Sequence, residues 1–300
     1  MTKFVNNAKT ALLMGAMMGL FVLVGSYYGK HGMILALILG GLFNFIAYFT
    51  SDKIAIASVG AVEVFPDSPG AGSRVYHLVD ELRQNAGLPM PRVYISPAQA
   101  PNAFATGRSP AKAAVCITEG ALRLLSESEV RGVMGHELAH VRNRDTLISC
   151  VSAMIAGVLS YFAQFAMFGG TRGSRDRDDR GGGNPLALIA VLLAPIAAVL
   201  IQAMISRSRE FVADADGAAI AGSPDGLISA LQRLEAASQR IPMPNHNPAM
   251  NNMFIVEPFF GGMGRLFATH PPMEKRIAAL ERLRAEMTGR ALETGNVMRV

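Results

Sequence analysis

The stretch from Ser126 to Asp145, SESEVRGVMGHELAHVRNRD, constrains this 300-residue chain more than any other segment. His136 and His140 lie four positions apart within it. On an α-helix such residues share one face, so both imidazoles can bind the same metal ion. Glu137 lies beside them, where it can take a proton from a water molecule. The spacing therefore predicts a metal-binding helix.

The surrounding residues favour a helix here. Ser126 and Glu129 have the spacing of a capping box, in which each side chain satisfies a free backbone N–H group. Gly132 and Gly135 weaken the helix, but small residues beside His136 allow another backbone to approach closely. The alternative is a buried helix with two unconnected histidines. Apolar residues follow the cap at roughly helical spacing, at Val130, Val133, Met134 and Val141.

The composition points to a membrane protein. Half of the residues are hydrophobic, only 17% are charged, and the mean hydropathy is +0.28. The net charge of +5 is scattered, so we expect basic residues to flank membrane segments and expect no nucleic-acid partner. Cys116 and Cys150 make no disulfide framework, which fits a reducing compartment.

Two apolar runs precede the histidine motif, at 11–28 and 33–49, and are separated by a short turn at 29–32. They predict a helical hairpin in the membrane, although a signal peptide is the alternative for the first run. Asn44 within the second run predicts a helix–helix interface in preference to lipid.

Two further apolar runs, at 147–168 and 185–205, flank a hydrophilic loop at 169–184. They are long enough to span a bilayer. The alternative is a hairpin partly shielded by the catalytic domain. We therefore expect four parts: a membrane hairpin at 1–50, the first catalytic part at 51–146, a second hairpin at 147–205, and the second catalytic part at 206–300.

The remaining segments read as an α+β domain, so the fold class is mainly α with a small β-sheet beside the metal helix. Residues 241–264 form an irregular segment that either borders the cleft or is a surface excursion. The pattern predicts strands at 92–96, 102–105 and 113–118, and helices at 73–86, 207–221, 225–240 and 272–289.

A catalytic zinc ion needs a third protein ligand and an open position. Position 146 is Thr, and we expect the helix to carry Asp145 away from the metal. Glu210 is the better candidate. Asp214, one turn further on, can accept the second ring N–H of a zinc-binding histidine. The alternative is an ordinary acidic helix face, and Asp216 is assigned to solvent or a cap.

The segments HELAHVRNRD, REFVADADGAA, NAFATG and THPP together resemble the HtpX-type integral-membrane zinc metalloproteases over nearly the whole chain. The resemblance implies membrane-embedded helices, a zincin-like (gluzincin) catalytic domain and one Zn²⁺ per chain. Its ligands would be His136, His140 and Glu210, with Glu137 as general base. It also implies a bacterial inner-membrane enzyme facing the cytoplasm, which degrades misfolded or damaged membrane proteins as quality control under stress.

The resemblance implies two further roles. His270 would donate a hydrogen bond to the oxyanion, supported by Arg276, although a loop histidine is often structural. An edge strand would pair with an extended peptide. The alternative is an internal strand with its Phe in the core. The residues of this strand are Asn102, Ala103, Phe104 and Ala105.

Topology gives an independent test of the orientation. His140 and Glu210 must lie on one side of the membrane, so the two runs between them cross twice or not at all. Arg172, Arg175, Arg177 and Arg180 in the intervening loop argue against crossing. The positive-inside rule favours a cytoplasmic catalytic domain, given Lys3, Lys9, Lys53, Arg142, Arg144, Arg207 and Arg209.

Two other functions remain as alternatives. A structural zinc in a non-enzymatic scaffold would need a fourth ligand, and no cysteine or spare histidine has matching spacing. A processing enzyme of the prenyl-peptide type would cleave defined substrates at one site. The expected partners are unfolded or membrane-protein substrates and the lipid bilayer.

Overall fold

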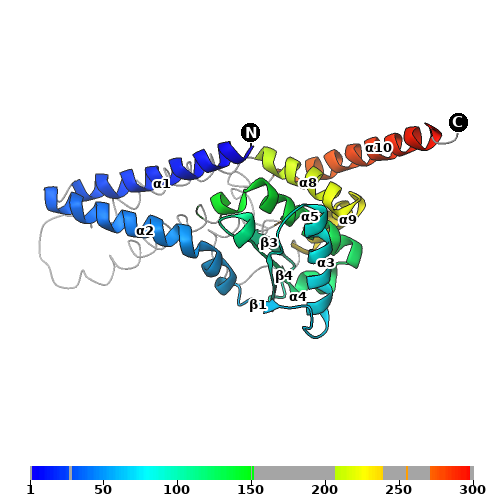
Figure 1. The fold of residues 1–300 in the computed structure, drawn as a ribbon, viewed down its shortest axis with the longest axis horizontal. Coiled ribbons are helices and arrows are strands. Elements are labelled where there is room, and N and C mark those ends of the chain that lie inside the picture. The colour runs from blue at the N-terminus through cyan, green and yellow to red at the C-terminus, as the bar shows by residue number, and fades with distance from the viewer. Residues whose placement is uncertain are drawn as a thin grey trace, which may run out of the picture.

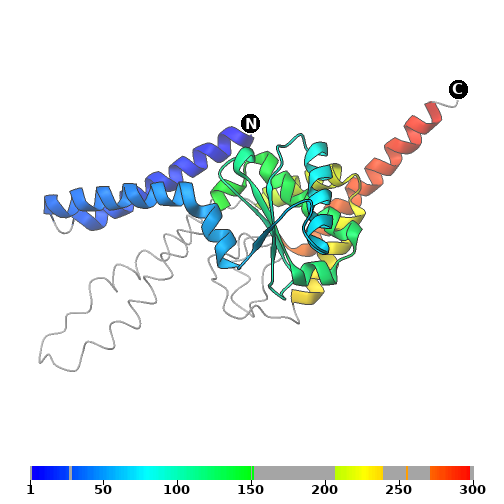
Figure 2. The ribbon, with the colours of Figure 1, turned by 60° about the horizontal axis from the view of Figure 1, so that its bottom comes forward.

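A helical hairpin projects from one side of a rounded α+β domain, and a single helix projects from the other side (Figures 1 and 2). The structure is a computed structural model that describes residues 2–26, 29–149, 151, 207–238, 255 and 271–297. The predicted loop at 169–184 and the run at 185–205 lie outside these residues. So do His270 and the segment 241–264, apart from Ile255.

The hairpin consists of α1 (Thr2–Ser26) and α2 (Gly29–Ser58). Within the described residues, α2 is the helix long and apolar enough to cross a membrane, and α1 contains a shorter apolar stretch. Asn44 Nδ2 donates a hydrogen bond to the Met14 carbonyl at 3.0 Å, which confirms the helix–helix interface predicted for Asn44. The predicted turn at 29–32 is wrong, because these residues form the first turn of α2.

The last turns of α2 pack onto one face of the sheet. Ala55 and Ile56 are buried in one cluster with Phe104 and Cys116. Asp52 accepts a hydrogen bond from Arg92 at 2.9 Å and holds the helix to the sheet beside this cluster. The end of α2 is thus part of the core of the domain.

The sheet is mixed, with the order β1-β2-β4-β3. β2 and β4 are parallel, and the other two pairs are antiparallel. The three predicted strands are confirmed to within one residue. The first strand was missed because three residues are too few to show alternation. The strands are β1 (Val62–Val64), β2 (Arg92–Ser96), β3 (Ala103–Thr106) and β4 (Ala114–Thr118).

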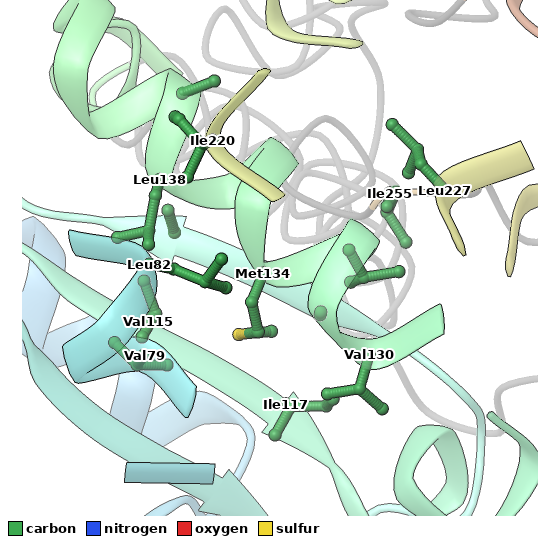
Figure 3. Packing of buried hydrophobic residues seen from close by; sticks show 14 of the residues in the cluster. Val79, Leu82, Val115, Ile117, Val130, Met134, Leu138, Ile220, Leu227 and Ile255 are labelled. Carbon is green, nitrogen blue, oxygen red and sulfur yellow. The ribbon is translucent and has the colours of Figure 1, made fainter. Parts of the chain in front are cut away.

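Helix α5 is the centre of the domain. Met134 and Leu138 are fully buried between the sheet and α3 on one side and the later helices on the other (Figure 3). Ser126 and Glu129 form the predicted capping box at its start. The helices are α3 (Ala71–Asn85), α4 (Glu119–Leu124), α5 (Glu127–Asn143), α8 (Arg207–Ala221), α9 (Asp225–Ser238) and α10 (Met273–Val297), with a 3-10 turn, η1 (Pro110–Lys112).

The fold class is confirmed: the described chain is mainly helical with a small mixed sheet beside the metal helix. The end predicted for the last helix at 289 is wrong, since α10 continues to Val297. A single glycine inside a helix costs only about 1 kcal/mol relative to alanine, so Gly289 does not end it.

Helices α5 and α8 are in backbone contact beside His136. A Cβ atom on Gly217 would lie 2.7 Å from the backbone N and Cα of His136. A Cβ atom on Gly135 would lie 2.7 Å from the Gly217 carbonyl oxygen. This confirms that small residues beside His136 admit another backbone, and that backbone carries Glu210 and Asp214.

We predict that Gly217→Ala destabilises the protein by about 1–3 kcal/mol, because the added methyl group meets backbone atoms that cannot rotate away. The midpoint of thermal unfolding in detergent, followed by circular dichroism, measures the loss. Gly15→Ala is the control, because a Cβ atom there meets no heavy atom within 4 Å. Equal midpoints for the two variants would contradict the prediction.

Candidate metal centre

Three side chains from α5 and α8 converge on one point. Nε2 of His136 lies 3.1 Å from Nε2 of His140. The Glu210 carboxylate oxygens lie 3.8 Å from the first of these nitrogens and 3.7 Å from the second. All the potential ligand atoms lie within 4.8 Å of one another. The fold thus brings together the three ligands predicted from the sequence.

The three residues fit a catalytic zinc ion. Zinc binds histidine nitrogens and carboxylate oxygens at about 2.0–2.1 Å, and tetrahedral geometry then separates neighbouring ligand atoms by about 3.4 Å. The measured separations of 3.1, 3.7 and 3.8 Å lie around this value. Two histidines and one glutamate leave the fourth position open, as catalytic sites require.

His136 is oriented by a buried ion pair. Its Nδ1 lies 2.9 Å from an Asp214 carboxylate oxygen, which favours the tautomer that leaves Nε2 available to a metal. Arg276 donates to both oxygens of Asp214, at 2.8 and 2.7 Å. Burial opposes the charge of Asp214, but the Arg276 charge and hydrogen bonds outweigh it and lower the pKa of Asp214 to about 2. The proposed role of Asp214 therefore has the right geometry.

Arg276 is completely buried and also lies 3.7 Å from the Glu210 carboxylate. It therefore contacts two acidic residues of the site. The resemblance assigned it to the support of His270, which lies outside the described residues. Its contacts with Asp214 and Glu210 join segments far apart in the sequence, so no local spacing could predict them.

Asp145 is not among the three potential ligands, as expected, but it stays beside the site. Its carboxylate lies 3.1 Å from Nδ1 of His140, the counterpart of the contact that Asp214 makes with the other histidine. Helix α5 stops because Arg144 adopts a left-handed conformation, with φ 59° and ψ 35°. The chain turns back, and the Asp145 N–H donates to the His140 carbonyl at 3.0 Å. This contact could have been expected from the sequence, because a metal-binding histidine usually donates its second ring N–H to a carboxylate or another acceptor.

The carboxylates also affect the protonation of His140. Burial alone would lower its pKa, but the hydrogen bond to Asp145 and the nearby Glu210 and Glu137 carboxylates raise the pKa to about 9. In the absence of a metal, this imidazole therefore holds a proton near neutral pH. A metal ion must displace that proton to bind.

Glu137 lies between the histidines and the sheet. The carboxyl group is buried, and it accepts a hydrogen bond from the backbone N–H of Ala105 in β3. Burial raises the pKa of Glu137, and the neighbouring imidazoles oppose this shift. A carboxyl group with a raised pKa next to a metal site is suited to accept and return a proton.

β3 is the edge strand beside this carboxyl group. The N–H of Thr118 donates to the Asn102 carbonyl at 2.9 Å, so in antiparallel pairing the backbone groups of Ala103 and Ala105 point away from β4. Phe104 is 2% exposed and packs against the end of α2. Among the described strands, β3 is therefore an edge strand that also carries its Phe in the core.

Asp216 does not reach the three ligands. It accepts a hydrogen bond from Asn143 at 2.8 Å and forms an ion pair with Arg142 at 2.7 Å. These contacts tie the end of α5 to α8. The expectation of a solvent or capping role is therefore replaced by a link between the two helices that carry the site.

The family model for peptidase family M48 matches residues 71–284. Three relatives named "Protease HtpX homolog" come from Desulforapulum autotrophicum, Nostoc punctiforme and Pyrococcus furiosus. They are 47%, 44% and 46% identical to this chain. The alignments cover 92%, 95% and 93% of this chain, and 89%, 99% and 96% of the relatives.

A solved structure, that of Ste24p from S. mikatae, has a similar fold with a TM-score of 0.50 and 15% sequence identity. The similarity covers 92% of this chain, which spans 66% of that structure. This likeness concerns the fold alone. The family model and the relatives, which extend over most of the chain, show its ancestry. The chain belongs to peptidase family M48 and is a membrane-associated metalloprotease of the HtpX type.

Proposed function

We propose that this protein is a zinc endopeptidase of the bacterial inner membrane that degrades misfolded or damaged membrane proteins under stress. The observation that carries the proposal is the convergence of His136, His140 and Glu210 at separations that fit tetrahedral zinc. A metal site of this kind beside a buried carboxyl group and an edge strand has the parts that peptide hydrolysis needs.

Zinc held by His136, His140 and Glu210 supplies Lewis-acid chemistry, which polarises a peptide carbonyl and makes a water molecule more acidic. Glu137 takes the proton of the attacking water and delivers it to the leaving amine. Burial assists the first transfer, because a raised pKa makes the Glu137 carboxylate a stronger base. Asp214 and Asp145 hold the two imidazole rings in orientation throughout.

The substrate lies along β3 in this proposal. The outward carbonyl groups of Ala103 and Ala105 pair with an extended peptide, and such pairing tolerates many side chains. The Ala103 N–H is already bonded to Asn102 Oδ1. The Ala105 N–H is bonded to Glu137, so its carbonyl is the group available to the peptide. Asn102, Ala103, Phe104 and Ala105 form the binding strand, and His270 is the proposed donor to the oxyanion.

Membrane proteins are the proposed substrates because the site is attached directly to the hairpin. The buried end of α2 packs against Phe104 of the binding strand through Ala55 and Ile56. The basic residues that flank the apolar runs favour a cytoplasmic catalytic domain.

We predict that Glu137→Gln retains zinc and cleaves an unfolded reporter protein in detergent about 10²–10⁴-fold more slowly, because the proton acceptor is lost. Gel-based cleavage rates and elemental analysis of the purified protein provide the two measurements. Glu127→Gln, an exposed change in the first turn of the same helix, is the matched control. Cleavage by Glu137→Gln at the wild-type rate would reject the assigned base.

We predict that Asp145→Asn weakens zinc binding about 10–100-fold, because His140 loses the carboxylate that orients its ring. Competition with a chromogenic chelator measures the affinity. Asp216→Asn is the control, since the Asp216 carboxylate joins α8 to α5 without contacting any of the three metal-binding residues. Equal affinities for the two variants would show that Asp145 does not position His140.

We predict that cleavage of one unfolded membrane protein yields many products, since backbone pairing at β3 selects little for sequence. Mass spectrometry of the products maps the cleavage sites, and the same substrate kept folded serves as control. A single defined site would favour the alternative, a processing enzyme of the prenyl-peptide type.

A further inference from the structure

Asn102, at the start of β3, makes two hydrogen bonds with one atom. Its Oδ1 accepts the backbone N–H of Ala103 at 2.8 Å and the backbone N–H of Ile255 at 3.3 Å. Both Asn102 and Ile255 are 2% exposed, so water does not replace these bonds. Ile255 also belongs to the main hydrophobic core (Figure 3). The side chain of Asn102 thus joins the edge strand to a segment far away in the sequence.

The second backbone group of Ile255 continues this connection. Its carbonyl accepts a hydrogen bond from Nη1 of Arg276 at 3.2 Å. Arg276 holds Asp214 through two further hydrogen bonds, and Asp214 contacts Nδ1 of His136. The contacts therefore run without a break from the edge strand to a metal ligand.

We propose that Asn102 is a positioning residue for the metal centre, which acts through Ile255, Arg276 and Asp214 on His136. The edge strand and the orienting ion pair then move as one unit, since Ile255 is bonded to both. The proposal rests on the proposed function for the metal and for the role of β3. Its metal end can be measured without any cleavage.

The chemistry of the asparagine explains why this residue suits the position. Two backbone N–H groups that point at one buried location need an acceptor with two lone pairs, and a side-chain carbonyl provides them. Without it, the buried N–H of Ile255 loses its partner. Ile255 can then shift, and the hydrogen bond from its carbonyl to Arg276 loosens.

The rate of zinc release into excess chelator, followed by colour, tests the proposal. We expect Asn102→Ala to release zinc about tenfold faster than wild type, and Asn102→Asp, which keeps the acceptor oxygen, to release it within about twofold of wild type. Asn85→Ala is the matched control, since Asn85 joins α3 to the end of α8 through the Ile220 carbonyl and touches no metal ligand. Wild-type release from Asn102→Ala, or fast release from Asn102→Asp or Asn85→Ala, would overturn the proposal.

A double-mutant cycle tests the route. If Asn102 acts through Arg276, the combination of Asn102→Ala with Arg276→Lys releases zinc no faster than the more affected single variant. Effects that multiply would show that the two residues act independently and would overturn the route. Asn102→Ser is the second variant should Asn102→Ala fail to fold. It removes the amide oxygen that bonds Ile255, so the same faster zinc release is expected.

These measurements separate the proposal from the proposed function. Loss of cleavage in Asn102→Ala with wild-type zinc release would overturn the positioning role and leave the peptidase in place. If Asn102→Ala and Arg276→Lys have non-additive effects on zinc release but the wild-type protein cleaves no substrate, the positioning role would be supported and the peptidase rejected.

Discussion

The close approach of α5 and α8 is the constraint on which the metal centre depends. A carboxylate side chain spans only a few ångströms, so Glu210 reaches the two imidazoles only if its helix lies against theirs. Gly135 and Gly217 provide that contact, since a side chain on either glycine would collide with the opposite backbone. Placement of Glu210 and Asp214 one turn apart then brings one residue to the ligand position and the other to the back of His136.

The charges buried by this contact are arranged in pairs. A buried ion pair adds little net stability, because both groups lose their hydration, but removal of one partner is costly. Arg276 faces two carboxylates, and each ligand histidine has its own aspartate. The main effect of the network is therefore orientation. The aspartates bond Nδ1 of each histidine, so Nε2 of each ring faces the metal position.

The sequence predicted the parts of this site whose signal is local. The capping box and the histidine spacing define α5, and the spacing of Glu210 and Asp214 identifies the third ligand with its neighbour. Other parts depend on tertiary geometry. Arg144 adopts a left-handed conformation and so returns Asp145 to His140, but this conformation is usually signalled by a glycine, which is absent here. The hydrogen bonds of Ile255 join segments that share no sequence pattern.

The hairpin and the catalytic domain are joined by a single continuous helix. The apolar run of α2 ends at Phe49, and Ala55 is already buried against the sheet. Six helical residues span about 9 Å. The sheet therefore begins less than two helical turns beyond the apolar run. Because Phe104 of the edge strand packs on this same stretch of α2, the position of the strand is determined by α2 as well as by α5.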